Sequence, residues 1–86
     1  MEIIFSKTFQ KQYKKLPQKI KIQVKNRIEL WQEQPNNPLL RLHRLDGKMS
    51  QFYSINITGD IRALYEIVDE NVYIYEMIGT HSQLYG

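Results

Sequence analysis

The sequence contains no cysteine, which excludes a disulfide framework and a thiolate-ligated zinc site. It also lacks an apolar run long enough to span a membrane, and no signal-peptide-like apolar segment stands at its start. These absences fit a reducing compartment, so we expect a cytoplasmic protein. With 86 residues, of which 42% are hydrophobic and 24% charged, the composition predicts one small folded domain over residues 1–86.

Acidic residues are scarce in the first third of the chain, where Glu2 is nearly the only one. The same third holds most of the basic residues: Lys7, Lys11, Lys14, Lys15, Lys19, Lys21, Lys25 and Arg27. This asymmetry is typical either of a surface that binds a polyanion or acidic protein, or of a solvated helix face. The charge pattern alone leaves both interpretations open.

The N-terminal half predicts a strand followed by two helices. Glu2–Phe5 is short and apolar, and Ser6 is placed to cap the following helix. Apolar residues then recur at helical spacing, and Pro17 divides them into a short helix and a longer one over residues 17–34. This apolar stripe consists of Phe5, Phe9, Tyr13, Leu16, Ile20, Val24, Ile28 and Trp31. We expect an αα-hairpin with the stripe, Trp31 included, in the core.

The C-terminal half predicts an antiparallel sheet. Residues 39–45 are mixed apolar and basic and end in a turn at Asp46-Gly47. Residues 49–57 and 61–68 alternate as strands, and the loop between them, residues 58–60, has the odd length that joins their apolar faces. This loop pairs Asn56 with Arg62 on the opposite face, which also carries Glu66. A last strand covers residues 72–78, but Glu76 interrupts its alternation, so its faces stay unassigned.

The predicted order is therefore β-α-α-β-β-β. We expect an α+β fold in which an N-terminal helical hairpin packs on one face of a mostly antiparallel sheet.

Polar groups with useful chemistry are concentrated after residue 40. His43, Asp60 and His81 are candidates for proton transfer, while Arg62, Lys48 and Arg44 are candidates for binding phosphate. Tyr85 could stack on a base or orient a phosphate. Each residue also has a structural interpretation. Asp60 could form a turn, Arg62 could pair with Glu66, Tyr85 could anchor the chain end, and His43 could be an ordinary surface residue.

Several motifs together resemble a known family. They are the lysine-rich helical hairpin, His43-Arg44-Leu45-Asp46-Gly47, Tyr53-Ser54-Ile55, Asp60-Ile61-Arg62 with Tyr65, and the terminal Ile78-Gly79-Thr80-His81-Ser82-Gln83-Leu84-Tyr85. In length, element order and motifs, the chain resembles the RelE/ParE superfamily of type II toxin–antitoxin toxins, and within it the YafQ-like mRNA interferases. The terminal Gly-Thr-His-Ser-x-Leu-aromatic motif is the most specific part of the resemblance.

The resemblance implies a ribosome-dependent endoribonuclease that cleaves mRNA in the ribosomal A site, uses no metal or other cofactor, and is inhibited by a cognate antitoxin. His81 matches the C-terminal catalytic histidine and Tyr85 the nearby aromatic. His43 matches the histidine before the Leu-x-Gly turn, and Asp60 the aspartate that opens the next strand. We expect His81 to be the general acid and Asp60 the base, with His43 as an orienting group or as the alternative base.

Two positions depart from the YafQ-like pattern. Asn56 stands where these enzymes often have another histidine, and Ile61 stands where some have tryptophan. Arg62 and Lys48, in contrast, suit the arginine- and lysine-based sites of the RelE branch. Two other functions stay open: a ParE-like toxin that inhibits DNA gyrase without cleaving RNA, and a degenerate toxin that only binds its antitoxin.

Overall fold

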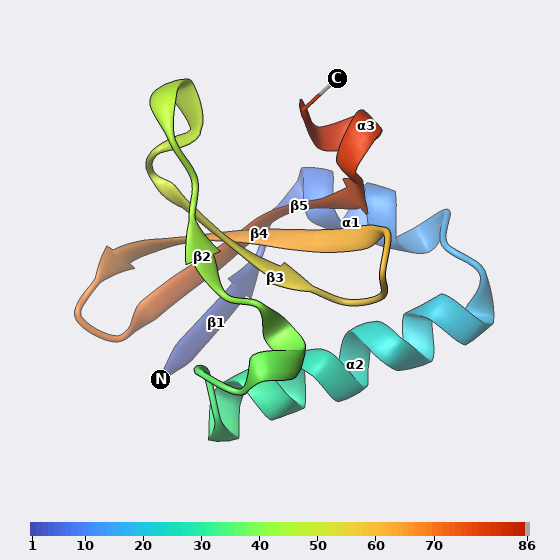
Figure 1. The fold of residues 1–86 in the computed structure, drawn as a ribbon, viewed down its shortest axis with the longest axis horizontal. Coiled ribbons are helices and arrows are strands. Elements are labelled where there is room, and N and C mark those ends of the chain that lie inside the picture. The colour runs from blue at the N-terminus through green and yellow to red at the C-terminus, as the bar shows by residue number, and fades with distance from the viewer. Residues whose placement is uncertain (86) are drawn as a thin grey trace.

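The computed structural model of the protein describes residues 1–85 and contains one mixed sheet with helices (Figure 1). Its elements are β1 (Glu2–Phe5), α1 (Lys7–Lys14), α2 (Gln18–Glu33), η1 (Pro38–Leu40), β2 (His43–Arg44), η2 (Gly47–Met49), β3 (Phe52–Asn56), β4 (Ile61–Asp69), β5 (Val72–Thr80) and α3 (His81–Tyr85). The strands lie in the order β1-β5-β4-β3-β2, and only the β1–β5 pair is parallel. The predicted α+β class is confirmed.

The two N-terminal helices begin where the sequence predicts. Ser6 Oγ accepts a hydrogen bond from the Phe9 amide at 3.0 Å, and the same hydroxyl donates to the Glu76 carbonyl of β5 at 2.8 Å. The cap therefore also ties the start of α1 to the sheet. Pro17 is the N-cap residue of α2, and its carbonyl accepts from the Ile20 and Lys21 amides.

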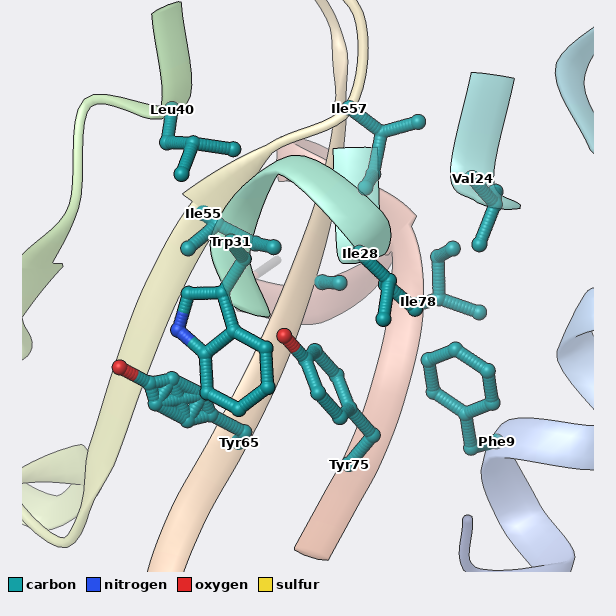
Figure 2. Packing of buried hydrophobic residues seen from close by; sticks show 11 residues of the cluster. Phe9, Val24, Ile28, Trp31, Leu40, Ile55, Ile57, Tyr65, Tyr75 and Ile78 are labelled. Carbon is teal, nitrogen blue, oxygen red and sulfur yellow. The ribbon is translucent and has the colours of Figure 1, made fainter. Parts of the chain in front are cut away.

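Aromatic rings fill the core between the helices and the sheet (Figure 2). Trp31 is only 2% exposed, and its ring centroid lies 4.9 Å from that of Tyr65, 5.2 Å from Tyr73 and 5.3 Å from Tyr75. Phe9 of α1 packs edge-on against Tyr75 at 5.8 Å. The helical part of the predicted apolar stripe therefore packs in or against the core, whereas Phe5 is exposed. The structural interpretation of Trp31 is confirmed.

The sheet has two different faces. The covered face, which packs against α1 and α2, carries Ile55, Ala63, Tyr65 and Tyr75. The opposite face, called the open face below, carries Asn56 and Arg62 as a cross-strand pair, as the loop length predicted. In Figure 1, α2 runs below the sheet, while α3 and the β2–β3 connection project on the other side.

A β-bulge explains why the last strand could not be assigned from its pattern. Leu64 pairs with Met77, but the next residue, Tyr65, pairs with Tyr75, so Glu76 is left without a partner. The extra residue reverses the alternation, which lets Tyr75 and Ile78 both enter the core although they are three positions apart.

Three local expectations were incomplete. The strand expected from residue 49 begins at Phe52, because Gly47, at φ +63°, turns the chain into the 3₁₀ turn η2. Residues 39–45 form η1 and the short edge strand β2 rather than an unassigned segment. The chain end forms α3, which the strand pattern did not predict. On the open face, the apolar side chains of Phe52 and Leu64 are buried beside Asn56 and Arg62.

None of the helices within residues 1–85 is both long and apolar enough to cross a bilayer.

Candidate active site

A hollow of about 420 Å³ lies on the open face, where α3 meets the connection around β2 and η2. Three segments that are distant in sequence supply its lining, which consists of His43, Leu45, Asp46, Met49, Arg62, His81 and Tyr85. Four of the seven predicted site residues are among them. The hollow therefore gathers two imidazoles, a guanidinium and a phenol in one place.

His43 is exposed on the edge strand β2, where it pairs with Ser54. Its Nδ1 lies 2.9 Å from the carbonyl oxygen of Arg41. Because a carbonyl can only accept, Nδ1 must carry the proton of this hydrogen bond. Arg41 adopts a left-handed conformation, with φ +46°, at the end of η1. In the neutral tautomer that this bond favours, Nε2 is unprotonated, which is the form a general base needs.

Arg62 lies in β4, one residue after the strand begins. Its Nη1 donates to the carbonyls of Gly59 and Asp60 at 3.4 and 3.3 Å. These bonds hold the guanidinium beside the turn without neutralising its charge. The remaining donors of the fork are suited to a phosphate.

His81 and Tyr85 lie four residues apart in α3, so they share one side of the helix. Their ring centroids are 4.6 Å apart, and the ring planes cross at 63°. The Tyr85 hydroxyl is buried, and within residues 1–85 it has no hydrogen-bond partner.

Asp60 is exposed and does not line the hollow. Asp60 is nevertheless close to His81 along the sheet. Ile61, the residue after Asp60, pairs with Thr80, and His81 is the residue after Thr80. Asp60 and His81 therefore sit at the same end of two neighbouring strands. The amides of Asp60 and Ile61 donate to Thr58 Oγ1 at 3.2 and 2.9 Å, so the turn has a structural role of its own.

Lys48 and Arg44 also lie outside the lining. Lys48 is exposed in η2, next to Met49, which does line the hollow. The Arg44 guanidinium lies 5.8 Å from the centroid of the Tyr53 ring, and its Nε donates to the Ser50 carbonyl at 2.7 Å. Because Arg44 pairs with Tyr53, its side chain belongs to the face opposite that of His43.

Two groups at the site were missed from sequence. Asp46 lines the hollow, whereas the sequence suggested only a turn residue before Gly47. Gln83 bonds back to Thr80, and the spacing Thr80-x-x-Gln83 is a capping-box signature that could have predicted α3.

Two carboxyl groups meet on the open face outside the hollow. Burial raises the pKa of Glu76, and the neighbouring Glu66 carboxyl raises that pKa further. On the covered face, burial raises the pKa of Tyr65 and Tyr75. Within residues 1–85, no three histidine, aspartate or glutamate side chains are grouped as a metal site.

A larger hollow of about 770 Å³ lies between α1 and α2. Phe5, Phe9, Tyr13, Val24 and Ile28 dominate its lining, and it contains no histidine. This larger hollow is a mostly apolar groove between helices, whereas the two histidines and Arg62 line the smaller hollow.

Comparison with known proteins identifies the family and matches the fold. The family model described as "Bacterial toxin of type II toxin-antitoxin system, YafQ" matches residues 1–86. Among solved structures, YafQ from E. coli is 20% identical, with a TM-score of 0.84 and coverage of 99% of this chain and 98% of that one. YafQ in the E. coli DinJ–YafQ toxin–antitoxin complex is 21% identical, with a TM-score of 0.82 and coverage of 99% and 97%.

A more distant neighbour is the YoeB/ParE toxin from Agrobacterium tumefaciens, which is 16% identical, with a TM-score of 0.78 and coverage of 94% of this chain and 99% of that one. No curated protein matches the sequence at a significant level.

Proposed function

The chain belongs to the YafQ family of type II toxin–antitoxin toxins, and on this premise we propose that it is a ribosome-dependent mRNA endoribonuclease. The observation that carries the proposal is the convergence of His43, Arg62, His81 and Tyr85 in one hollow. These groups match the needs of RNA cleavage without a metal: a base, an acid, a cation for the phosphate and an aromatic ring for a nucleotide.

The proposed reaction starts with the 2′-hydroxyl of the RNA. His43 Nε2 takes its proton, because the hydrogen bond to the Arg41 carbonyl keeps the proton of the neutral ring on Nδ1. The 2′-oxygen then forms a bond to phosphorus while the bond to the 5′-oxygen breaks. His81 donates a proton to that leaving oxygen, which yields a 2′,3′-cyclic phosphate and a 5′-hydroxyl. Acid and base groups of this kind each contribute about 10²–10⁴-fold to a rate.

Asp60 is the alternative base, since its position brings it beside His81 at the end of the strands. The orientation of His43 and its place in the hollow favour His43.

Arg62 would stabilise the negative charge that develops on the phosphorane. The fork is already held beside the turn by two backbone carbonyls, so little reorganisation is needed. The Tyr85 ring, which lines the hollow, would stack on a base and so position the nucleotide. Lys48, on the projecting turn η2, would reach the RNA backbone outside the hollow. Arg44 would contact RNA only if its side chain left the Tyr53 ring.

The partners follow from the family and the charge. The basic α1 and α2 surface is suited to ribosomal RNA and to an acidic protein segment. The solved DinJ–YafQ complex is a toxin bound to its antitoxin, and we propose a cognate antitoxin for this chain as well. Its site of action would be the cytoplasm, where the ribosomes are.

The test is expression of the wild type and His81→Ala in cells, followed by mapping of mRNA 5′ ends. Codon-phased cuts should appear with the wild type and fall by about 10²–10⁴-fold with His81→Ala. Ser82→Ala, at the next exposed position of α3, is the matched control and should cut like the wild type. Intact mRNA together with trapped gyrase–DNA complexes would instead establish the ParE-like function, and intact mRNA alone would establish a degenerate toxin.

A further inference from the structure

The helix α3, which carries His81 and Tyr85, is too short to be stable on its own. It is five residues long. Isolated helices this short are unstable in water. Its first three residues, His81, Ser82 and Gln83, are exposed, so burial does not hold them.

Two reciprocal hydrogen bonds hold the start of this helix. Thr80 Oγ1 accepts from the Gln83 amide at 3.1 Å, and Gln83 Oε1 accepts from the Thr80 amide at 2.8 Å. Thr80 is the last residue of β5 and pairs with Ile61 of β4. The bonds therefore join α3 directly to the sheet, and His81 lies between the two residues that form them.

Gly79 gives the glutamine side chain its space. A Cβ atom at position 79 would lie 2.8 Å from Gln83 Oε1, well inside van der Waals contact. Gly79 is also the cross-strand partner of Arg62. The absence of a side chain there lets the Gln83 amide lie over the strand end, next to the proposed phosphate-binding residue.

We propose that Gln83 is the positioning residue that fixes His81 and Tyr85 relative to each other and to Arg62. The catalytic part of this inference rests on the proposed nuclease function, in which His81 is the general acid and Tyr85 contacts the substrate. With both bonds formed, the first turn of α3 is helical, and residues four apart reach the observed ring separation of 4.6 Å. Without them, the tail would sample many conformations in which the hollow is incomplete.

This role is separate from global stability. The core lies on the covered face, and no residue of α3 belongs to it. Loss of the Gln83 side chain should therefore loosen α3 and leave the rest of the protein folded.

The test compares Gln83→Ala, Gln83→Glu and the control Ser82→Ala by single-turnover cleavage on programmed ribosomes. Gln83→Ala should lower the cleavage rate by about 5- to 30-fold, the effect of losing one helix cap, with an unchanged thermal midpoint. Gln83→Glu keeps the acceptor oxygen and should restore most of the rate. Gly79→Ala, which displaces the amide by steric contact, should reproduce the loss while leaving Gln83 present.

A second readout needs no activity. In proton NMR, the Tyr85 ring should shift the His81 imidazole signals in the wild type and in Gln83→Glu, and this ring-current shift should collapse in Gln83→Ala. Wild-type cleavage by Gln83→Ala, failure of Gln83→Glu to restore the rate, or a ring-current shift that survives in Gln83→Ala would each overturn the inference. If the shift collapses but His81→Ala cleaves like the wild type, the nuclease proposal fails and the positioning of the two rings by Gln83 stands.

Discussion

The two faces of the sheet are built in opposite ways. On the covered face, Trp31 contacts Tyr65 and Tyr75 in a cluster closed to solvent, so each ring is held from several sides. On the open face, His43 and Arg62 are each held by hydrogen bonds to nearby backbone carbonyls. Packing fixes the first set, and a few local polar contacts orient the second.

One strand serves both faces. In β4, Ala63 and Tyr65 point into the core, while Arg62 between the turn and Ala63 points into the hollow. Because side chains alternate along a strand, the burial of Ala63 and Tyr65 also sets the direction of Arg62. The residues that stabilise the fold and the residues of the candidate site thus lie on opposite faces of the same strand. Substitutions on the covered face should change stability, and substitutions in the hollow should change cleavage. Four substitutions, ordered by expected effect, test this.

Trp31→Ala should have the largest effect. It removes the centre of the aromatic cluster and should lower the free energy of unfolding by about 3–5 kcal/mol. Urea denaturation measures this loss, and Gln32→Ala, at the next and exposed position of α2, is the control. Cleavage per folded molecule should stay at the wild-type level. A specific loss of cleavage in the folded fraction would show that the faces are not independent.

Arg62→Ala should do the reverse. Removing one preorganised charge from a catalytic site costs about 10²–10³-fold in rate, so single-turnover cleavage should fall by that factor while the thermal midpoint holds. Arg62→Lys keeps the charge without the planar fork and should recover only part of the rate. Arg44→Ala should cost less, since that side chain lies over Tyr53 and outside the hollow. Equal losses for Arg62→Ala and Arg44→Ala would argue against the hollow as the site.

Ser6→Ala should have a smaller effect, confined to stability. The substitution removes the helix cap to the Phe9 amide and the bond to the Glu76 carbonyl, and should cost about 1–2 kcal/mol. Thr8→Ala, at an exposed position in the same turn of α1, is the control, and both are compared by thermal unfolding. A Ser6→Ala protein as stable as the control would show that water replaces both bonds.

Glu76→Gln should have the smallest effect and is the exception to the separation, because an open-face residue should change stability. Burial and the nearby Glu66 raise the pKa of Glu76, so the folded protein holds this proton to higher pH than the unfolded chain does. The group's contribution to stability is therefore complete below the ordinary glutamate range and is lost as pH rises through the raised folded pKa. Glutamine at position 76 cannot ionise, so the variant does not lose this stability as the pH rises.

The thermal midpoint of Glu76→Gln should exceed that of the wild type at pH 7 and equal it at pH 4. Glu70→Gln, in the exposed β4–β5 turn, is the control. An equal gain at both pH values would mean that the gain does not come from ionisation.

Local patterns predicted much of this molecule. The Ser6 cap, the division of the helices at Pro17 and the pairing of Asn56 with Arg62 are short-range features, and each is present in the structure. The helix α3 also has a short-range signal, the capping spacing of Thr80 and Gln83. It was not predicted, because the strand pattern and the terminal motif were interpreted only for His81.

The sequence by itself determined the two N-terminal helices, the main strands, the hairpin register and the identity of the candidate groups, because these depend on spacing over a few residues. The tertiary structure decided the bulge at Glu76, the parallel pairing of β1 with β5, and which candidates meet. His43, Arg62 and His81 line one hollow while Arg44 points to the other face, and that outcome depends on how strands distant in sequence align. Alignment of this kind is set by burial of the whole covered face, which no short stretch of the chain encodes.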